Sequence, residues 1–308
     1  MKFTLRQIAV FVAVARHESV SRAARALALS QSATSTALGE LERQYDTQLF
    51  DRLGKTLRLN ELGQSMLPRA VELIERADGI ESMLEGRTGY GRLRIGATLT
   101  IGNYLATLIV ADFLKRHPEG SAQLQVHNTA TIIEQVARYE LDLGLIEGNC
   151  RHPDLTVEPW VEDELVVFCA PTHPLARRGT ARPEELASES WIVREVGSGT
   201  RETLDRALHH HHWTLNVRLE LEHTEAIKRA VEFGLGIGCI SRLALREAFR
   251  RGSLVAIETP ELDLRRYFHF LWHKKKFQTT GMREFVALCR AMTAGATRSD
   301  EIEWPFIP

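Results

Sequence analysis

The stretch SVSRAARALALSQSATSTALGELERQYDTQLFDRLGKTLRLNELG, residues 19–63, sets the fold of the N-terminal part of this chain. Just before and within it, apolar residues recur at helical spacing and predict a first amphipathic helix: Leu5, Ile8, Phe11, Val12 and Ala15. Ser21 can cap a second, short helix whose Ala23, Ala24 and Leu27 face inward. Because alanine is small, two crossing helices can approach closely there. The spacing predicts a helix-turn-helix.

A third helix is predicted over residues 31–45, with Ser30 as its N-cap. Its buried stripe is predicted to be Ala33, Ala37, Leu38 and Leu41. Its opposite face carries short polar side chains: Gln31, Ser32, Thr34, Ser35 and Thr36. Such side chains at the N-terminal end of a helix can bond base edges, and the free backbone N–H groups favour phosphate. This helix is therefore predicted to read DNA.

A small basic hairpin is predicted next, since residues 49–52 and 56–59 flank Gly54 and Lys55. The whole chain has a formal charge of −1, but residues 1–58 hold nine Lys and Arg against five Asp and Glu, which leaves +4. A module that binds only protein is the alternative to a DNA-binding one. The predicted DNA contacts come from the second and third helices and the hairpin: Ser21, Arg22, Ser30, Gln31, Ser32, Thr34, Ser35, Thr36, Arg52 and Lys55.

The same segment resembles the DNA-binding domain of the LysR-type transcriptional regulators. The matching residues are Ala23-Ala24, Leu27, Ser30-Gln31-Ser32-Ala33, Ser35, Leu41-Glu42, Leu49-Phe50, Arg52 and Gly63. Three positions depart from the family pattern: Ser32 replaces the usual Pro, Asp46 a frequent Gly, and Asn60 a frequent Thr. Ser32 keeps a polar helix start and Asn60 remains a good cap, so these departures bear on base preference rather than on the fold.

Residues 60–89 are predicted to form a linker helix that pairs two chains. Its apolar residues step by three and four positions and form a heptad seam: Leu62, Met66, Ala70, Leu73, Ala77, Ile80 and Leu84. An ordinary helix packed on its own domain is the alternative. Pro68 interrupts the hydrogen-bond ladder near the start, and Gly86 with Gly89-Tyr90-Gly91 is predicted to end the helix in a hinge.

From Arg92 onward strands and helices alternate, which predicts an α/β domain with parallel sheets and helices on both faces. The strands are expected at 93–97, 123–126, 141–146, 165–170, 191–193, 237–240 and 267–272, and the helices at 103–116, 131–139, 224–233 and 279–292.

The expected organisation is a winged helix-turn-helix over 1–59, the linker helix, and two lobes with crossings near 162–165 and 264–267. Lobe I is expected over 90–163 and 266–300, lobe II over 164–265, and a tail over 301–308. Residues 298–308 show no pattern and are expected to be mobile. This organisation matches the periplasmic-binding-protein-like effector domain that the resemblance implies.

Ligands of open α/β sheets bind beyond the carboxyl ends of strands, at helix N-termini. Four segments follow that rule, at 98–101, 128–129, 147–149 and 195–202, although a Gly-Ser-Gly-Thr loop can also serve only as a helix cap. Hydroxyls and the fork of donors on Arg201 suit an oxyanion. The predicted ligand-binding residues are Thr98, Thr100, Ile101, Asn128, Thr129, Glu147, Glu195, Gly197, Ser198, Gly199, Thr200, Arg201 and Thr224.

Several strings narrow the resemblance to the YeiE and CysL branch of the family: Ile101–Leu105, Ile146–Gly148, Glu158–Trp160, Glu162–Phe168, Gly197–Glu202, Thr224–Lys228 and Gly234–Ile237. The resemblance implies a small sulfur oxyanion, sulfite in particular, as effector, and no cofactor. It also implies promoter double-stranded DNA, a dimer of dimers and RNA polymerase as partners of an activator. Glu147 and Glu195 would repel an anion unless they pair with Arg201 and neighbouring cations. The alternative is a ligand with an ammonium group, such as an amino acid.

The apolar runs and the cysteine spacing bear on membrane insertion, secretion and disulfide formation. No apolar run approaches the roughly 20 residues of a membrane span, and the apolar run at 8–15 has helical periodicity, which opposes cleavage as a signal peptide. A cytoplasmic protein is therefore expected. Four cysteines lie far apart and are expected to be free thiols: Cys150, Cys169, Cys239 and Cys289.

A histidine run, a lysine run and two possible nucleophiles could indicate metal binding, nucleic-acid binding or catalysis. His209–His212 suggests a metal site but favours a solvated loop, and Lys274–Lys276 resembles a nucleic-acid patch but favours a solvated strand end. Ser198 or Cys150 could act as a nucleophile, yet neither lies in an elbow motif, and no metal triad or Walker loop is present. An enzyme is therefore not expected. A plain solute-binding protein is opposed by the DNA-reading N-terminus.

Overall fold

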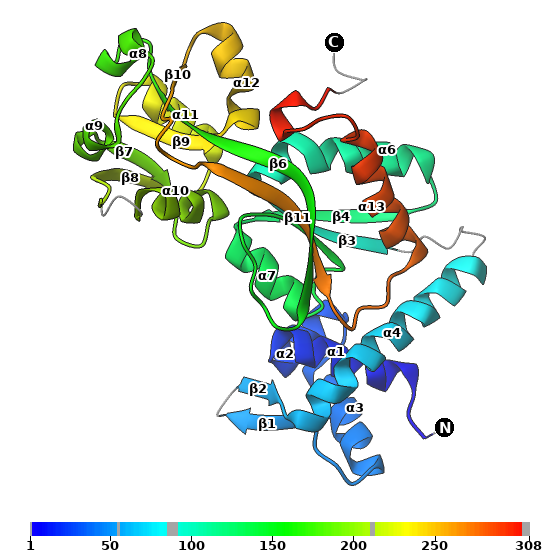
Figure 1. Cartoon of the computed structure of the whole chain (residues 1–308). Coiled ribbons are helices and arrows are strands. Elements are labelled where there is room, and N and C mark those ends of the chain that lie inside the picture. Colours follow the sequence, from blue (N-terminus) through cyan, green and yellow to red (C-terminus); the bar gives the residue numbers. More distant parts are fainter. Residues whose placement is uncertain (1, 54–55, 85–91, 210–212, 304–308) are drawn as a thin grey trace.

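A computed structural model describes residues 2–53, 56–84, 92–209 and 213–303 (Figure 1). The N-terminal part is a winged helix-turn-helix followed by a long helix: α1 (Leu5–His17), α2 (Val20–Ala26), α3 (Gln31–Gln44), β1 (Phe50–Leu53), β2 (Thr56–Leu59) and α4 (Glu61–Leu84). The strands β1 and β2 pair antiparallel as the predicted hairpin, while its tip, residues 54–55, lies outside the described residues. Ala23 and Ala24 are buried where α2 crosses its neighbours.

Helix caps fix where these helices begin. Ser30 caps α3, and its hydroxyl accepts a hydrogen bond from the backbone N–H of Ala33 at 3.1 Å. The predicted cap of α2 is wrong, because Ser19 holds that position and accepts from the N–H of Arg22 at 3.4 Å. Ser19 has the extended backbone that a cap requires, whereas Ser21 already lies within the helix.

Helix α4 uses two different faces. One face packs against α1: Leu67, Ala70 and Val71 are buried in a core shared with that helix. Ala70 was predicted to lie in the seam between two chains, but it packs within its own chain, as the alternative prediction had it. Leu62, Ile80 and Leu84 of the same seam are exposed by 48%, 61% and 83%. Large apolar side chains left in water on one stripe leave a surface that a second chain could cover.

The C-terminal part is a two-lobed α/β structure built on one strand order, β4-β3-β5-β11-β6-β9-β7-β8, with β10 beside β6. Lobe I holds β3 (Arg92–Thr98), β4 (Ser121–His127) and β5 (Leu143–Glu147), and lobe II holds β7 (Trp191–Arg194), β8 (Val217–Leu221), β9 (Ile237–Ser241) and β10 (Val255–Ile257). Two long strands, β6 (Leu155–Cys169) and β11 (Arg265–His273), pair antiparallel and run from one lobe into the other (Figure 1). The sheets are therefore mixed rather than parallel throughout, because both crossing strands run against their neighbours.

Helices flank the sheet in each lobe. In lobe I they are α5 (Leu99–Ile101), a π-helical turn η1 (Gly102–Ala106), α6 (Thr107–Arg116), α7 (Thr129–Ala137) and α13 (Thr280–Met292). In lobe II they are α8 (Pro174–Arg178), α9 (Pro183–Ser188), α10 (Gly199–His209), α11 (Thr224–Glu232) and α12 (Arg242–Arg251). Five of the elements were not predicted from the sequence: α8, α9, α12, β8 and β10. The helix expected at 103–116 begins earlier, at Leu99.

The segment expected to be a mobile tail is ordered as far as residue 303. Ser299 begins a short 3-10 helix, η2 (Ser299–Glu301), and its buried hydroxyl donates to Asp163 Oδ1 at 2.5 Å. Ile302 is only 1% exposed and belongs to the lobe I core. The prediction of a mobile tail was wrong because Ser299 and Ile302 contact residues that are far away in the sequence, and no local pattern indicates such contacts. Residues 304–308 lie outside the described part.

A charged cluster with two buried members, Asp142 and Lys276, and two half-buried ones, Glu75 and Arg94, joins α4 to lobe I, and we call it the junction cluster. Lys276 Nζ contacts Glu75 Oε1 and lies 2.9 Å from Asp142 Oδ1, and Arg94 Nη2 lies 3.5 Å from Glu75 Oε1. Lys276 is buried, so the solvated strand end predicted for residues 274–276 is wrong at this residue, although Lys274 and Lys275 are exposed. Tyr139 of lobe I packs into the core formed by α1 and α4.

Candidate functional site

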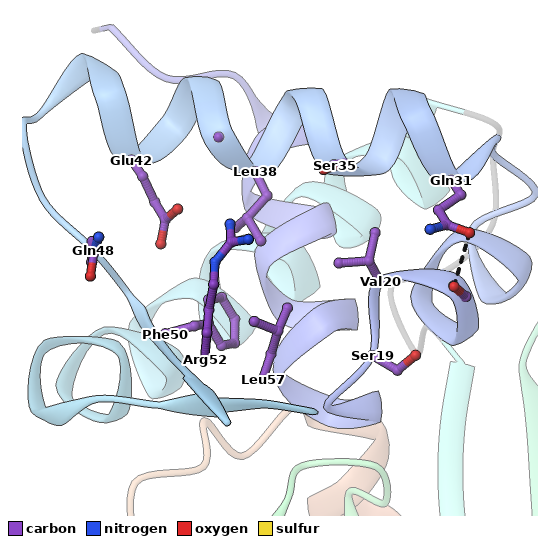
Figure 2. Close-up of a pocket in the computed structure, with 12 residues that line it drawn as sticks. Ser19, Val20, Gln31, Ser35, Leu38, Glu42, Gln48, Phe50, Arg52 and Leu57 are labelled. Carbon is purple, nitrogen blue, oxygen red and sulfur yellow. Dashed lines mark hydrogen bonds between the residues drawn. The ribbon is translucent and has the colours of Figure 1, made fainter. Parts of the chain in front are cut away.

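A groove of about 490 Å³ lies between α3 and the hairpin (Figure 2). Four predicted DNA contacts line it: Ser21, Gln31, Ser35 and Arg52. The Ser21 hydroxyl donates to Gln31 Oε1 at 3.0 Å, which holds the amide at the N-terminal end of α3. Arg52 extends from β1 toward α3 (Figure 2). The groove thus combines an amide, hydroxyls and a guanidinium, the groups that bond base edges and phosphates.

The six remaining predicted DNA contacts have different surroundings. Arg22, Ser32 and Thr36 are exposed, and Ser30 serves as the cap of α3. Thr34 is fully buried and its hydroxyl donates to the carbonyl of Ser30 at 3.0 Å, so its placement on the DNA face was wrong. Thr34 falls on the core side of the turn, where its methyl packs and its hydroxyl is satisfied by the backbone. Lys55 lies outside the described residues.

Replacing Gln31 by alanine is expected to cost roughly 1–3 kcal/mol of binding at a specific site and little on random DNA, because an amide reads base edges. Gln44→Ala provides the control, since Gln44 is exposed at the far end of the same helix. Fluorescence anisotropy with promoter and scrambled duplexes at several salt concentrations measures both. Equal losses on the two duplexes would mean that Gln31 only positions the protein.

A second cluster of polar side chains lies between the two lobes. Arg266, at the start of β11, donates through Nε to Asp163 Oδ2 at 2.7 Å and through Nη1 to the Thr200 hydroxyl at 3.0 Å. Its Nη2 lies 3.6 Å from Oε2 of Glu147, the last residue of β5. Thr100 donates to Glu147 Oε1 at 3.2 Å from lobe I, and Thr200 donates to the same oxygen at 3.4 Å from lobe II. These residues form the interlobe site.

The interlobe site is deeply buried and strongly charged. Glu147 is 1% exposed and Asp163 is fully buried. Burial alone would lower the pKa of the Arg266 guanidinium, but Glu147 and Asp163 outweigh it and the pKa is raised. Two atoms of the site have no hydrogen-bond partner, Glu147 Oε2 and Arg266 Nη2. Unpaired buried polar atoms in a native fold commonly mark a binding site or bound water.

Close backbone contact completes the site. A Cβ at Gly199 would lie 2.1 Å from the carbonyl oxygen of Glu147, so only glycine lets the start of α10 approach the end of β5 this closely. Thr129 bridges the contact: its hydroxyl donates to the Glu147 carbonyl at 3.2 Å and accepts from the Gly199 N–H at 3.1 Å. Gly199 therefore brings the lobes together.

Two central residues of this site, Arg266 and Asp163, were not among the predicted ligand-binding residues. A signal for Arg266 was present, because alternation along β11 places it on the same face as the buried Phe268 and Phe270. An arginine on a buried strand face needs a charged partner. No comparable local signal identifies that partner, since Asp163 lies 103 residues away in the chain.

Other predicted ligand contacts have different surroundings. Ile101 is fully buried in the lobe I core, so it packs rather than faces the site. Asn128 caps α7 by accepting from the Thr131 N–H at 3.0 Å. Thr98 donates to the Leu145 carbonyl at 3.5 Å, Ser198 accepts from the Thr200 N–H at 3.2 Å, and Thr224 is buried at the start of α11. The predicted residues are thus brought together only in part.

One of the two alternatives had Glu147 and Glu195 pair with Arg201 and neighbouring cations; both carboxylates pair with other arginines, and Arg201 pairs with neither. Arg201 Nε binds Asp205 at 2.9 Å, and its Nη1 lies 3.2 Å from Glu220. Glu195 pairs instead with the buried Arg194, at 2.8 Å, as Glu147 pairs with Arg266. Arg201 lies on α10, where its neighbour one turn later is closer than either glutamate.

A cavity of about 730 Å³ adjoins the interlobe site between α7 and α10. Thr129 and Ser198 line it together with Gly197, whose φ of +93° favours glycine. The remaining lining comes from both helices, the segment after β5 and the loop between β7 and α10: Ala130, Ile133, Asn149, Val196, Arg201, Glu202, Asp205, Arg206 and His209. Since Thr129 bonds the Glu147 carbonyl, the cavity reaches to within one residue of the site.

A second contact between the lobes lies at the π-helical turn. Tyr104 donates to Glu225 Oε1, and Lys228 Nζ lies 2.6 Å from the same oxygen. Burial and the nearby Glu225 raise the pKa of Tyr104 well above its ordinary value, so the phenol stays a donor at neutral pH. Among the described residues, polar contacts therefore join lobe I to lobe II at the π-helical turn as well as at the interlobe site.

Comparison with known proteins identifies both parts of the chain. Residues 5–64 match the model of the bacterial regulatory helix-turn-helix protein of the lysR family, and residues 87–294 match the LysR substrate binding domain. The chain belongs to the LysR family. It is a ligand-responsive transcriptional regulator and not an enzyme.

Relatives and solved structures agree with this assignment. This LysR regulator is 43% identical over 289 residues to YeiE of Escherichia coli K12, an alignment that covers 94% of this chain and 98% of YeiE. It is 28% identical to CysL of Bacillus subtilis, over 91% and 95% of the two chains. A full-length variant of OxyR from Pseudomonas aeruginosa shares the fold, with a TM-score of 0.71 at 19% identity and full coverage of both chains. The CcmR regulatory domain of Synechocystis PCC6803, solved in complex with 2-PG, gives a TM-score of 0.63 at 29% identity over 67% of this chain and 99% of that one.

The cysteines, the possible metal ligands and the helix lengths bear on three further predictions from the sequence. All four cysteines are free, and burial raises the pKa of Cys150, the most exposed of them, so its thiol is a weak nucleophile. Among the residues described, no group of three or more His, Cys, Asp or Glu could hold a metal ion. His210–His212 lie outside that part of the chain. No helix within the described ranges is long and apolar enough to cross a membrane.

Proposed function

We propose that this LysR regulator binds promoter DNA as a dimer of dimers in the cytoplasm and senses a small oxyanion, sulfite in particular, at the interlobe site. The observation that carries the proposal is Arg266, a fully buried guanidinium whose Nη2 has no hydrogen-bond partner. It lies beside threonine hydroxyls at the carboxyl end of β5, the edge where open α/β sheets bind ligands. Contact with RNA polymerase as an activator belongs to the same proposal.

An amine-bearing metabolite is the second candidate effector, because Glu147 and Glu195 could bind an ammonium group. Each of these carboxylates already has an arginine partner, Arg266 and Arg194. Arg266 also binds Asp163, so two carboxylates share one guanidinium. The oxyanion is supported by Nη2 of Arg266, a buried donor without a hydrogen-bond partner. The complex of CcmR with 2-PG supports a small-molecule effector in general.

Sulfite is expected to bind the full-length protein, and Thr100→Val is expected to weaken that binding by about 1 kcal/mol or somewhat more, because the hydroxyl that orients Glu147 is lost. Thr107→Val is the matched control, since the Thr107 hydroxyl donates to the Gly102 carbonyl within its own helical segment. Titration calorimetry measures both variants. Binding of amine-bearing metabolites with no response to sulfite would favour the second candidate.

Effector binding is proposed to change promoter geometry rather than to release DNA. Closure between two lobes is a modest hinge motion, and DNA-binding units on long helices such as α4 would amplify it. The effector can shift the balance only by its different affinity for the two conformations. DNase footprints with and without sulfite are expected to differ in extent while the total affinity for DNA stays similar.

Assembly through α4 is tested at Ile80, which is 61% exposed on the predicted seam. Ile80→Asp is expected to abolish pairing of chains and cooperative promoter binding, because it places like charges opposite each other in an apolar contact. Glu81→Asp is the control, since it changes an exposed acid on the neighbouring face. Sedimentation velocity and DNA titration report the result. Unchanged sedimentation of Ile80→Asp would exclude this seam.

A further inference from the structure

The two unpaired atoms of the interlobe site differ in kind. Glu147 Oε2 is an acceptor, because its carboxylate is paired with Arg266, and Arg266 Nη2 is a donor; they lie 3.6 Å apart and make no hydrogen bond. Each of the two residues is more than nine-tenths buried. Leaving a buried polar atom unpaired costs about 1–3 kcal/mol, and more for a charged group. A bound group that satisfies both atoms would therefore be strongly favoured.

Few small anions can satisfy both atoms at once. A fully deprotonated oxyanion such as sulfate only accepts hydrogen bonds, so it would pair with Arg266 and repel Glu147. An ammonium group only donates, so it would suit Glu147 and repel Arg266. An oxyanion that keeps one proton does both, since its oxygens accept from Arg266 while its hydroxyl donates to Glu147.

We propose that the interlobe site selects oxyanions that carry a proton, such as hydrogen sulfite or hydrogen phosphate, and that Glu147 is the residue that rejects sulfate. This inference rests on the oxyanion function proposed above and adds the protonation state of the ligand. Glu147 acts by accepting a hydrogen bond from the ligand's hydroxyl, with Thr100 and Thr200 fixing its other carboxylate oxygen. No proton needs to leave the ligand.

The architecture allows a ligand to reach these atoms. Glu147 ends β5 in lobe I, Thr200 lies in α10 of lobe II, and Arg266 lies on the crossing strand β11. Separation of the lobes therefore opens the site along the contact between Glu147 and Gly199, which borders the cavity between α7 and α10. The hydroxyls of Thr129 and Ser198 line that cavity on the way to Glu147.

Other ionisable groups surround the pair and could add their own pH dependence. Asp163 on β6 binds Arg266, and Cys239 on β9 interacts with the same guanidinium. Glu202 on α10 lies near Gly148, and His269 on β11 is hydrogen-bonded to the backbone there. Burial lowers the pKa of His269, which keeps it neutral over the range of interest. A variant at Glu147 is needed to separate its effect from theirs.

Titration calorimetry on the full-length protein tests the proposal with sulfite and with the tetrahedral pair phosphate and sulfate. Sulfite takes up a proton near neutral pH, so its apparent affinity is expected to fall about tenfold per pH unit above that point. Phosphate keeps a proton at neutral pH, and it is expected to bind about ten- to a hundredfold more tightly than sulfate, which has nearly the same shape. In Glu147→Gln the amide can donate, so sulfate should gain affinity and the pH dependence of sulfite binding should flatten. Glu185→Gln, at the carboxylate on α9 that pairs with Arg178, should change neither.

The outcomes separate this inference from the function on which it rests. If no oxyanion binds the parent protein at any pH, the proposed function fails and the inference with it. If sulfite binds with an affinity that ignores pH, or if sulfate competes equally, the function stands and the inference is overturned. Should Glu147→Gln fail to fold, calorimetry of the parent in buffers with different ionisation heats still decides. Uptake of about one proton per site in alkaline solution is expected, and no uptake would refute the role of Glu147.

Discussion

Replacing Arg266 by methionine is expected to lower the free energy of unfolding by about 3–5 kcal/mol at neutral pH, because it leaves buried carboxylates without their cation. Asp163 is fully buried and loses the donor that lies 2.7 Å away, although Ser241 and Ser299 still donate to its other oxygen. Glu147 keeps only the hydroxyls of Thr100 and Thr200. The loss should appear in urea unfolding of the full-length protein.

Arg265→Met is the matched control for this substitution. Arg265 is the neighbouring residue on β11, but its side chain is 69% exposed and pairs with the equally exposed Asp263. An exposed pair of this kind contributes little, so no measurable change in unfolding is expected. Combining Arg266→Met with Asp163→Asn should recover part of the loss, because the variant no longer buries that charge. Equal stability of the parent and Arg266→Met would show that the carboxylates do not depend on the guanidinium.

Lys276→Met is expected to destabilise the protein by about 2–4 kcal/mol and to loosen α4 from lobe I, since the junction cluster loses a buried cation. Lys276 contacts Glu75 of α4 and Asp142 of lobe I, and its side chain is 2% exposed. Arg94 remains beside both acids, so the loss should be smaller than for Arg266. Hydrogen exchange of α4 should rise in the variant. Lys275→Met, which changes an exposed neighbour, should leave exchange unchanged.

The cost of removing Lys276 should depend on pH in a defined direction. Burial raises the pKa of Glu75, while Lys276 and Arg94 lower it. Burial would also raise the pKa of Asp142, but Lys276 and Arg94 outweigh it and that pKa is lowered. Without Lys276 both carboxyls hold protons more tightly in the folded state, so the variant gains stability relative to the parent as pH falls. The unfolded state is common to both proteins, so the difference should be full at neutral pH, begin to narrow as pH falls through the raised carboxyl pKa values of the folded variant, and continue to narrow down to the lowered pKa of Asp142 in the parent. If the stability difference between the parent and Lys276→Met grew as pH falls, Lys276 would not stabilise the ionised forms of Glu75 and Asp142.

The junction cluster and the interlobe site lie at opposite ends of the same strands. Arg94 lies near the start of β3, Asp142 directly precedes β5, and Lys276 follows the end of β11. At the other ends lie Thr98, Glu147 and Arg266. The lobe I sheet therefore extends from the candidate effector site to the junction cluster that contacts α4 (Figure 1).

Elements with local causes could be predicted from the amino-acid order alone. The third helix starts at Ser30 because a cap acts within three residues, and the hairpin and most strands follow from alternation over a few positions. Local motifs also carried the resemblance to the family, and four of the residues predicted to contact DNA line one groove. They misplaced Ser21 and Thr34, because periodicity does not say which polar residue caps a helix or turns inward.

Which charges meet depends on tertiary packing. Lys276 and Glu75 are 201 residues apart in the chain, and Arg266 and Asp163 are 103 apart. No periodicity or cap relates residues at such separations. Their pairing depends on how β11 crosses between the lobes and on where α4 packs, and so on the summed burial of many apolar side chains. Once packing had buried these charges, desolvation made pairing with the nearest opposite charge obligatory. For that reason Glu147 is paired with Arg266, and Arg201, the cation favoured by its sequence position, pairs instead with Asp205.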